Sequence, residues 1–322
     1  MDDMTHTQAD SQADSQADTA AQQGTLQDFG ADAQFFEYTA AADPVVAKIP
    51  FAIFHAREHE SGATREIVWD LSGDIGTEWE ATSPNLLASF LRIRAGERLH
   101  TQARATSRMF HVIRGSGETR GSFGAMRWSK GDLFALPGGE RVEHTAFEDA
   151  ALYTVSDSPL LCYLGVEPKE SRFRPTLHSA ERMLAEMRKV NNDPEARQRN
   201  RNGVLLANKA APLTMTLTHC LWSLFNELPA RVVQKPHRHN SVALDLCVAA
   251  APGTYTLIGE QLDAQGVIVN PVRRDWVPGS AFVTPPGLWH SHHNETDVPA
   301  IVLPVQDAGL HTWMRTLDIR FA

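Results

Sequence analysis

Short apolar runs, interrupted at close intervals by Gly and Pro, dominate this chain of 322 residues. One series of such runs occupies residues 86–158, and a second occupies residues 213–305. Runs of this length bounded by turn residues indicate β-strands, and their regular spacing is typical of a sandwich or barrel. The sequence therefore predicts an all-β protein built from two similar halves.

A helical segment separates the two series. Residues 179–190 place Met183, Leu184 and Met187 at helical spacing after Ser179, a residue type that caps helix N-termini. We expect a disordered tail at 1–30, a first β domain at 31–170, a helical linker at 171–210 and a second β domain at 211–322. The tail is expected because its polar, Ala-rich QADS repeat buries too little apolar surface to offset the entropy of ordering.

The composition excludes several classes of protein. A formal net charge of −9 is unsuited to a nucleic-acid surface, which needs clustered Lys and Arg. No apolar run approaches the roughly 20 residues that span a membrane, and the first residues lack the basic and apolar regions of a signal peptide. The three cysteines form no CxxC pair, as is usual in a reducing compartment. We therefore expect a cytoplasmic protein that binds neither nucleic acid nor membrane.

Two sequence patterns in the second half predict a metal site. The segment KPHRHNSVALD contains His237 and His239, whose imidazoles point to one face of a strand because side chains alternate. The segment from Gly279 to Asn294 fits G-x5-P-x-G-x2-H-x3-N, with His290 as its histidine. A lone histidine is more often a core or surface residue, but both patterns together favour a centre in which three imidazoles hold a divalent metal.

These two patterns resemble the first and second motifs of the cupin superfamily. The resemblance implies that each half is a jelly-roll barrel, also called a double-stranded β-helix. At the four ligand positions of these motifs the first half has Gln102, Arg104, Arg108 and Val142. We therefore expect a degenerate first barrel without metal. His100 and His144 lie two residues from ligand positions and would serve only in a shifted register.

The tandem arrangement, with HRHNSVAL and PPGLWHSHHNE in its second half, resembles the gentisate 1,2-dioxygenase family and its salicylate and 1-hydroxy-2-naphthoate relatives. The likeness begins near residue 45, and is weak in the first half and clear in the second. Familiar members hold their metal in the first barrel, whereas here only the second keeps ligands. The resemblance implies an Fe(II)-dependent, extradiol-type ring-cleaving oxidoreductase of aromatic degradation that forms homodimers or homotetramers.

Ala243 stands where the first cupin motif has a glutamate. A three-histidine site without that carboxylate leaves about three coordination positions open, enough for a bidentate substrate and O2. The uncompensated 2+ charge favours an anionic hydroxy acid such as gentisate or a substituted salicylate, for example a nitrosalicylate. The expected reaction cleaves the ring between the carboxyl-bearing and hydroxyl-bearing carbons. Fe(II) suits the redox role, although the affinity order alone favours other metals.

Other residues near the motifs are candidates for substrate contacts. His292 follows His290 by two, and the corresponding residue of the resembled family lies near the substrate carboxylate, so we predict that it is catalytic and substrate-binding. The further substrate-binding candidates are Arg273, Arg274, Trp276, Trp289 and Asp245. Solvated strand ends and core packing are the plainer roles for the arginines and tryptophans. We expect Arg238 to point away from the metal and Asn294 to bond backbone in a turn.

Two other classes of function remain open on the sequence. The metal could act only as a Lewis acid in a cupin isomerase, lyase or hydrolase. Alternatively, the barrel could be a non-catalytic ligand holder, since the same fold serves both purposes. Activity with Zn(II) in the absence of oxygen would favour the first alternative.

Overall fold

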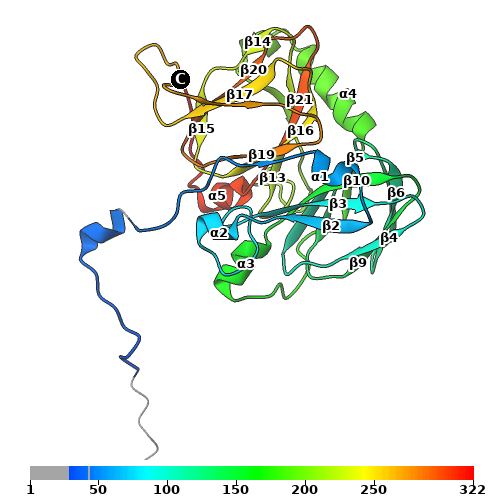
Figure 1. Cartoon of the computed structure of the whole chain (residues 1–322), viewed down its shortest axis with the longest axis horizontal. Coiled ribbons are helices and arrows are strands. Elements are labelled where there is room, and N and C mark those ends of the chain that lie inside the picture. The colour runs from blue at the N-terminus through cyan, green and yellow to red at the C-terminus, as the bar shows by residue number, and fades with distance from the viewer. Residues whose placement is uncertain (1–28, 43) are drawn as a thin grey trace, which may run out of the picture. The chain divides into compact units, whose positions relative to one another are not determined.

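The computed structural model describes residues 29–42 and 44–322. The chain divides into two compact units, Met1–Val45 and Val46–Ala322. The described part of the first unit contains one short 3-10 helix, η1 (Tyr38–Ala42). The disorder predicted for residues 1–30 falls on a segment that lies, apart from Phe29 and Gly30, outside the described residues. Figure 1 shows the β-rich second unit, which contains every motif discussed above.

The first half of the second unit consists of two sheets. Its larger sheet has six strands in the order β11-β8-β5-β10-β3-β2, and its smaller sheet has four in the order β4-β9-β6-β7. Phe110 and Phe134 of the larger sheet share a buried cluster with Trp128 and Val142 of the smaller one. The strands are β2 (Arg65–Trp69), β3 (Leu87–Ile93), β4 (Arg98–Thr101), β5 (Ser107–Arg114), β6 (Ser116–Gly121), β7 (Gly124–Ser129), β8 (Leu133–Pro137), β9 (Val142–Ala146), β10 (Ala150–Ser156) and β11 (Thr176–His178).

The second half repeats this plan. Its larger sheet has the order β1-β19-β16-β21-β13-β12, and its smaller sheet has the order β18-β17-β20-β15-β22, with β14 also paired to β20. The strands are β1 (Ile53–Phe54), β12 (Asn202–Leu205), β13 (Trp222–Leu228), β14 (Val232–Val233), β15 (His237–His239), β16 (Ala243–Ala249), β17 (Thr254–Gly259), β18 (Val272–Asp275), β19 (Ala281–Thr284), β20 (Trp289–Asn294), β21 (Ala300–Gln306) and β22 (Ile319–Phe321). The predicted all-β architecture with two similar halves is therefore confirmed.

The two halves share one hydrophobic core. Phe90 and Tyr153 of the first half belong to the same buried cluster as Leu244 and Val283 of the second. The halves are also connected by one strand that crosses over, because β1, which precedes the first half, pairs with β19 of the second. Since side chains alternate along β16, Leu244 faces this shared core while Ala243 faces the opposite side of the strand.

The predicted connecting helix is confirmed as α4 (Ala180–Asn191), and Ser179 accepts a hydrogen bond from the Arg182 amide at 3.4 Å. The same connector also supplies β11 to the first half and β12 to the second. The remaining helices are α1 (Arg57–Glu60), α2 (Ser72–Ile75), α3 (Ser158–Leu164), α5 (Ala308–Met314) and the 3-10 turn η2 (Ala196–Gln198). Among the helices that the structure describes, none is both long and apolar enough to cross a membrane.

Candidate metal centre

Three buried histidines meet on two neighbouring strands. β15 carries His237 and His239 on one face, and β20 places His290 directly opposite His237 in antiparallel register. One ring nitrogen from each histidine lies within 4.8 Å of the others. The ring of His290 is centred 4.0 Å from that of His237 and 4.9 Å from that of His239. Pairing of the two motif strands thus produces the cluster.

Backbone carbonyls orient two of these rings. The Nδ1 of His239 donates to the Ser241 carbonyl at 2.8 Å, and the Nδ1 of His290 donates to the Leu288 carbonyl at 3.1 Å. A carbonyl can only accept, so in both rings the proton resides on Nδ1 and the Nε2 lone pair is free. A hydrogen bond from the other ring nitrogen, such as these bonds from Nδ1, commonly holds a metal-binding imidazole in the correct tautomer.

The electrostatics of the cluster keep the rings neutral. Burial lowers the pKa of His239 to about 4, and the hydrogen bond to Ser241 only partly opposes this shift. Burial, followed by the proximity of the other histidines and of Arg201, holds the pKa values of His237 and His290 well below 6.5. Metal ions bind the neutral imidazole, so three buried neutral rings with converging nitrogens fit a divalent first-row metal.

Arg201, which the sequence analysis missed, reaches this cluster. Its Nη2 lies 2.8 Å from His237 Nε2 and 3.2 Å from His292 Nε2. An arginine always donates, so both Nε2 atoms hold lone pairs. Burial lowers the pKa of Arg201, and Asp245 is the acid whose charge opposes that shift. Within the described chain no carboxylate forms an ion pair with this guanidinium, so an unneutralised cation lies beside the predicted metal ligands.

His292 lies next to the cluster, and hydrogen bonds on the side of its Nδ1 fix its ring. Its ring is centred 5.8 Å from that of His290. Its Nδ1 donates to Thr256 Oγ1 at 2.8 Å, and the same hydroxyl oxygen accepts from Trp276 Nε1 at 2.8 Å. We call this arrangement the second-barrel relay. Trp276 therefore orients His292 through Thr256.

A cavity of about 190 Å³ opens beside the histidines. Its polar lining comes from Arg201, His237, His239 and Gln306, and its apolar lining comes from Trp222, Leu224, Leu317, Ile319 and Phe321, with Gly203 and Ala308 between them. Phe321 stacks on His237 with ring centroids 5.8 Å apart, because β22 pairs with β15. Gln306 lies opposite Ala243 in the β16–β21 ladder and accepts from Ser241 Oγ at 2.8 Å. A short side chain and an amide thus occupy the place where a cupin glutamate would be.

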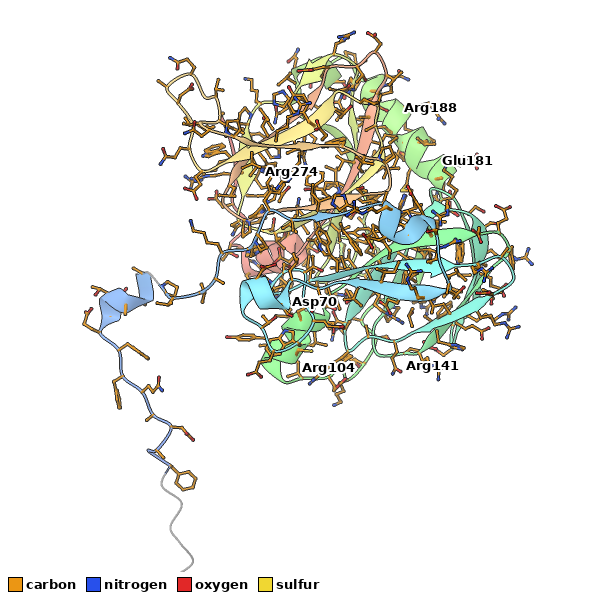
Figure 2. All side chains as sticks on the ribbon, viewed as in Figure 1. Asp70, Arg104, Arg141, Glu181, Arg188 and Arg274 are labelled. Atoms are coloured by element: carbon orange, nitrogen blue, oxygen red, sulfur yellow. The ribbon has the colours of Figure 1, made fainter. Side chains whose placement is uncertain are left out.

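The other substrate-binding candidates lie outside this lining. Arg273 pairs with Asp275 at 2.8 Å and covers the Tyr255 ring. Arg274, visible in Figure 2, covers the Phe51 ring and donates to the Phe51 carbonyl at 3.2 Å.

Trp289 and Asp245 also have structural neighbours of their own. Trp289 carries the Arg238 guanidinium 5.0 Å from its ring centroid. Asp245 is buried, accepts from Thr284 Oγ1 at 2.6 Å and has its pKa raised to about 6 by burial. As expected, Asn294 bonds the backbone, donating to the carbonyls of Leu228, Pro229 and Val298.

The first barrel contains a histidine in the place of His292 but no equivalent cluster among the described side chains. Val142 and His144 follow Pro137 at the spacing with which His290 and His292 follow Pro285. Thr119 Oγ1 lies 2.8 Å from His144 Nδ1 and accepts from Trp128 Nε1 at 3.0 Å, which we call the first-barrel relay. Thr101 Oγ1 lies 2.9 Å from His144 Nε2. His100 lies at the surface beside Glu143, so the structure does not bring it to His144.

Comparison with known proteins supports this fold. No family model matches the chain. A stretch of 98 residues is 30% identical to a 5-aminosalicylate 1,2-dioxygenase from Comamonas sp., and it covers 30% of this chain but only 26% of that protein. This match therefore spans about a quarter of the curated relative.

Solved structures match over most of the chain. A salicylate 1,2-dioxygenase from Pseudaminobacter salicylatoxidans aligns with a TM-score of 0.65 at 15% identity, over 89% of this chain and 92% of that one. The adduct of that enzyme with gentisate aligns with a TM-score of 0.66 at 15% identity, over 88% of each chain. An oxalate decarboxylase from Bacillus subtilis aligns with a TM-score of 0.51 at 13% identity, over 79% of this chain and 76% of that one. The predicted tandem cupin fold, and its likeness to salicylate dioxygenases, are confirmed.

Proposed function

We propose that this chain is a metal-dependent dioxygenase that opens the ring of a small aromatic hydroxy acid of the gentisate or substituted-salicylate type. One observation carries the proposal: three neutral histidines cluster beside a small cavity that is lined by two of them and by an arginine without an acidic partner among the described residues. The matched relative is named for 5-aminosalicylate, and one solved structure of similar fold holds gentisate. These names support the same class of substrate.

The proposed metal is Fe(II), held by His237, His239 and His290. When bound, iron would supply the one-electron redox chemistry that lets O2 react with an aromatic ring. The residues around the metal would orient the substrate and set the charge of the site. Ala243 and the Gln306 amide leave this side of the site without a carboxylate, which favours a substrate that brings its own negative charge.

Arg201 is the proposed partner of the substrate carboxylate. Its N–H groups form a planar fork that matches a carboxylate, and within the described residues its Nη2 contacts two ring nitrogens and no carboxylate. A single lone pair on His237 Nε2 cannot serve both a metal and Arg201. Metal binding at that atom would therefore release an arginine N–H for the substrate, while the contact to His292 Nε2 keeps the guanidinium in the cavity. We therefore propose that His292 positions the substrate through Arg201, whereas the sequence prediction made His292 catalytic and placed it at the substrate carboxylate itself.

The cavity volume limits the size of the substrate. About 190 Å³ is below the usual range of roughly 300–1,000 Å³ for ligand pockets, so we propose a single-ring acid and not a hydroxynaphthoate. Trp222 and Phe321 supply aromatic faces against which such a ring can stack. The ring would open between the carbons that carry the carboxylate and the hydroxyl, which is the extradiol-type cut predicted from the sequence.

Three further sequence predictions belong to this proposal. We propose that the boundaries at 31–170, 171–210 and 211–322 separate a metal-free first barrel, a linker and a metal-binding second barrel. We also propose that the chain works as a homodimer or homotetramer, as the family resemblance implies. A cytoplasmic location is consistent with three free cysteines.

The direct test is anaerobic reconstitution with Fe(II), followed by oxygen uptake and UV spectroscopy with gentisate, salicylate and its 5-amino and 5-nitro derivatives. We expect one O2 consumed per ring opened with at least one of them, and none with benzoate, which lacks the chelating hydroxyl. Absence of oxygen uptake with every hydroxy acid would refute the proposal. Turnover with Zn(II) and without oxygen would instead support Lewis-acid chemistry.

A further inference from the structure

The first barrel contains a cavity of its own, of about 200 Å³. Its walls come largely from one face of the larger sheet, where β2, β3, β5 and β10 lie side by side. The lining residues that matter here are Glu66, Ser89, Thr101, Arg108, Thr154 and Ser156. The cavity includes three of the four positions that correspond to metal ligands in a cupin, those of Gln102, Arg104 and Arg108. It is therefore the first-barrel counterpart of the second-barrel site.

A buried arginine is the principal feature of this cavity. Arg108 occupies the motif position that Ala243 holds in the second barrel, and its residue surface is only 3% exposed. Its Nη1 donates to Thr101 Oγ1 at 3.1 Å and its Nη2 donates to the Glu140 carbonyl at 2.8 Å. Its Nε is buried and has no hydrogen-bond partner in the structure. A buried, unsatisfied guanidinium N–H is costly, which calls for an explanation.

No acid in contact neutralises Arg108. Glu66 and Glu140 are the acids whose charges act on it, but neither forms an ion pair with it in the described chain. Burial lowers the pKa of Arg108 to about 10, which leaves the guanidinium charged at neutral pH. Arg104, the other arginine of the lining, is paired with Glu167 at 3.0 Å (Figure 2). Arg108 is therefore the lining cation available to an anion.

Hydroxyl groups surround this cation on the adjacent strands. Ser156 lies directly opposite Arg108 in the β5–β10 ladder, and Thr154 lies directly opposite Ser89 in the β10–β3 ladder. All three hydroxyl residues are buried. Hydroxyls can donate to a carboxylate as well as accept, so this face is built to hydrogen-bond a ligand. Glu66, more exposed, lies in the same lining and is an acceptor for a donor group on that ligand.

We propose that the first barrel is a second, metal-free ligand site, which binds a small carboxylic acid that also carries a hydroxyl or amino group. The carboxylate would accept from the Arg108 guanidinium and from the hydroxyls of Ser156 and Thr154. The hydroxyl or amino group would donate to Glu66. In this barrel a fixed guanidinium thus takes over the anion-binding role that a metal ion has in other cupins.

The test is isothermal titration of the full chain in which His290→Ala and Arg201→Gln have disabled the second-barrel site. The probes are salicylate and serine, an aromatic hydroxy acid and an aliphatic amino acid. We expect about one equivalent of at least one probe to bind. Benzoate lacks the donor and 2-hydroxybenzyl alcohol lacks the carboxylate, so both should bind more weakly.

Arg108→Gln in the same background should weaken binding by about tenfold or more, since it removes a charge-assisted hydrogen bond. The matched control is Arg98→Gln, which makes the same change of charge on an exposed arginine of the same barrel outside the lining. If Arg108→Gln does not fold, the paired change Thr154→Val and Ser156→Ala replaces it and should also weaken binding.

Three outcomes would overturn the proposal. They are no binding of either probe at millimolar concentration, unchanged affinity in Arg108→Gln, and unchanged affinity in the hydroxyl variant when that variant replaces it. Each would mean that Arg108 is a structural cation held by Thr101 and Glu140 alone. A gain of folding stability on addition of the bound probe, lost together with Arg108, would support the site independently.

Discussion

The two barrels contain the same buried relay but surround it differently. In each, a tryptophan N–H donates to a threonine hydroxyl that contacts the Nδ1 of a histidine. The members are Trp128, Thr119 and His144 in the first barrel, and Trp276, Thr256 and His292 in the second. The two barrels differ at the histidine Nε2, which meets the neutral Thr101 hydroxyl in the first and the Arg201 guanidinium in the second.

This difference indicates that the packing of the barrel interior does not depend on the proposed metal site. The relay persists in the first barrel, where the ligand positions hold no histidine, so the relay is part of the barrel's internal packing. The buried arginine of each barrel also comes from a different part of the chain. Arg108 lies on a strand of the first barrel, at the position of Ala243, whereas Arg201 lies in the connector. Among the described residues, only the cavity of the second barrel lies beside three clustered histidines.

The largest effect should come from removing a proposed ligand. His290→Ala deletes one of three converging imidazoles, so we expect bound metal to fall below about a tenth of an equivalent and oxygen uptake to fall by more than about 100-fold. Metal analysis and oxygen uptake would measure both. His293→Ala is the control, since that ring stacks on Tyr255 with centroids 4.7 Å apart. Full metal content in His290→Ala would break the assignment of the second barrel as the metal site.

Arg201→Gln tests whether the connector arginine is the substrate-binding cation. Loss of a charge-assisted bond of roughly 1.5–3 kcal/mol should raise KM by about 10-fold to 100-fold, with the metal content retained. Steady-state oxygen uptake at varied substrate concentration would show the change. Arg273→Gln, at an exposed arginine paired with Asp275, should behave as wild type. The comparison fails if the two variants show equal effects.

Ala243→Glu would restore the missing cupin carboxylate. The new side chain would compete with the substrate for open coordination positions, so we expect metal to be retained while turnover falls by about tenfold or more. Metal titration and kcat measured together distinguish this result from misfolding, and Ala243→Gln provides similar bulk without the charge. Undiminished turnover in Ala243→Glu would mean that the short side chain has no role in keeping positions open.

The last expected effect concerns stability and not activity, namely the acid sensitivity conferred by His144 of the first barrel. Burial lowers the pKa of His144 to about 3, below about 6.5 in the unfolded chain. The unfolded state therefore takes up a proton that the folded state refuses, so stability is full above pH 6.5 and falls as the pH drops toward 3. At pH 5 the part of this loss that comes from His144 should be about 2 kcal/mol.

Denaturant unfolding at pH 7 and pH 5 would measure this term. His144→Gln should lower stability at pH 7 but weaken the dependence on pH, because it removes the titrating group. His100→Gln is the matched control at a surface position. An unchanged pH dependence in His144→Gln would show that the loss of stability in acid arises elsewhere.

Local sequence patterns were sufficient to predict the strand-rich halves, the connecting helix and the histidine cluster. Alternation along a strand places His237 and His239 on one face, and the spacing of the second motif identifies His290 as their partner. The Ser179 cap was equally visible, because it depends on a few consecutive residues. The correspondence between His144 and His292 was also within reach of the sequence, since both occupy the same place after a Gly-x5-Pro segment.

Apart from His237 and His239, the lining of the cavity was decided by the tertiary structure. Arg201 lies in a polar connector, and nothing in its neighbourhood distinguishes it from Arg199 until the chain folds beside β15 and β20. Arg273 and Arg274, next to the second motif, instead cover the rings of Tyr255 and Phe51. Periodicity and spacing in the sequence therefore determined the three clustered histidines. The residues that contact them, such as Arg201, come from distant segments, which only sheet pairing and core packing bring together.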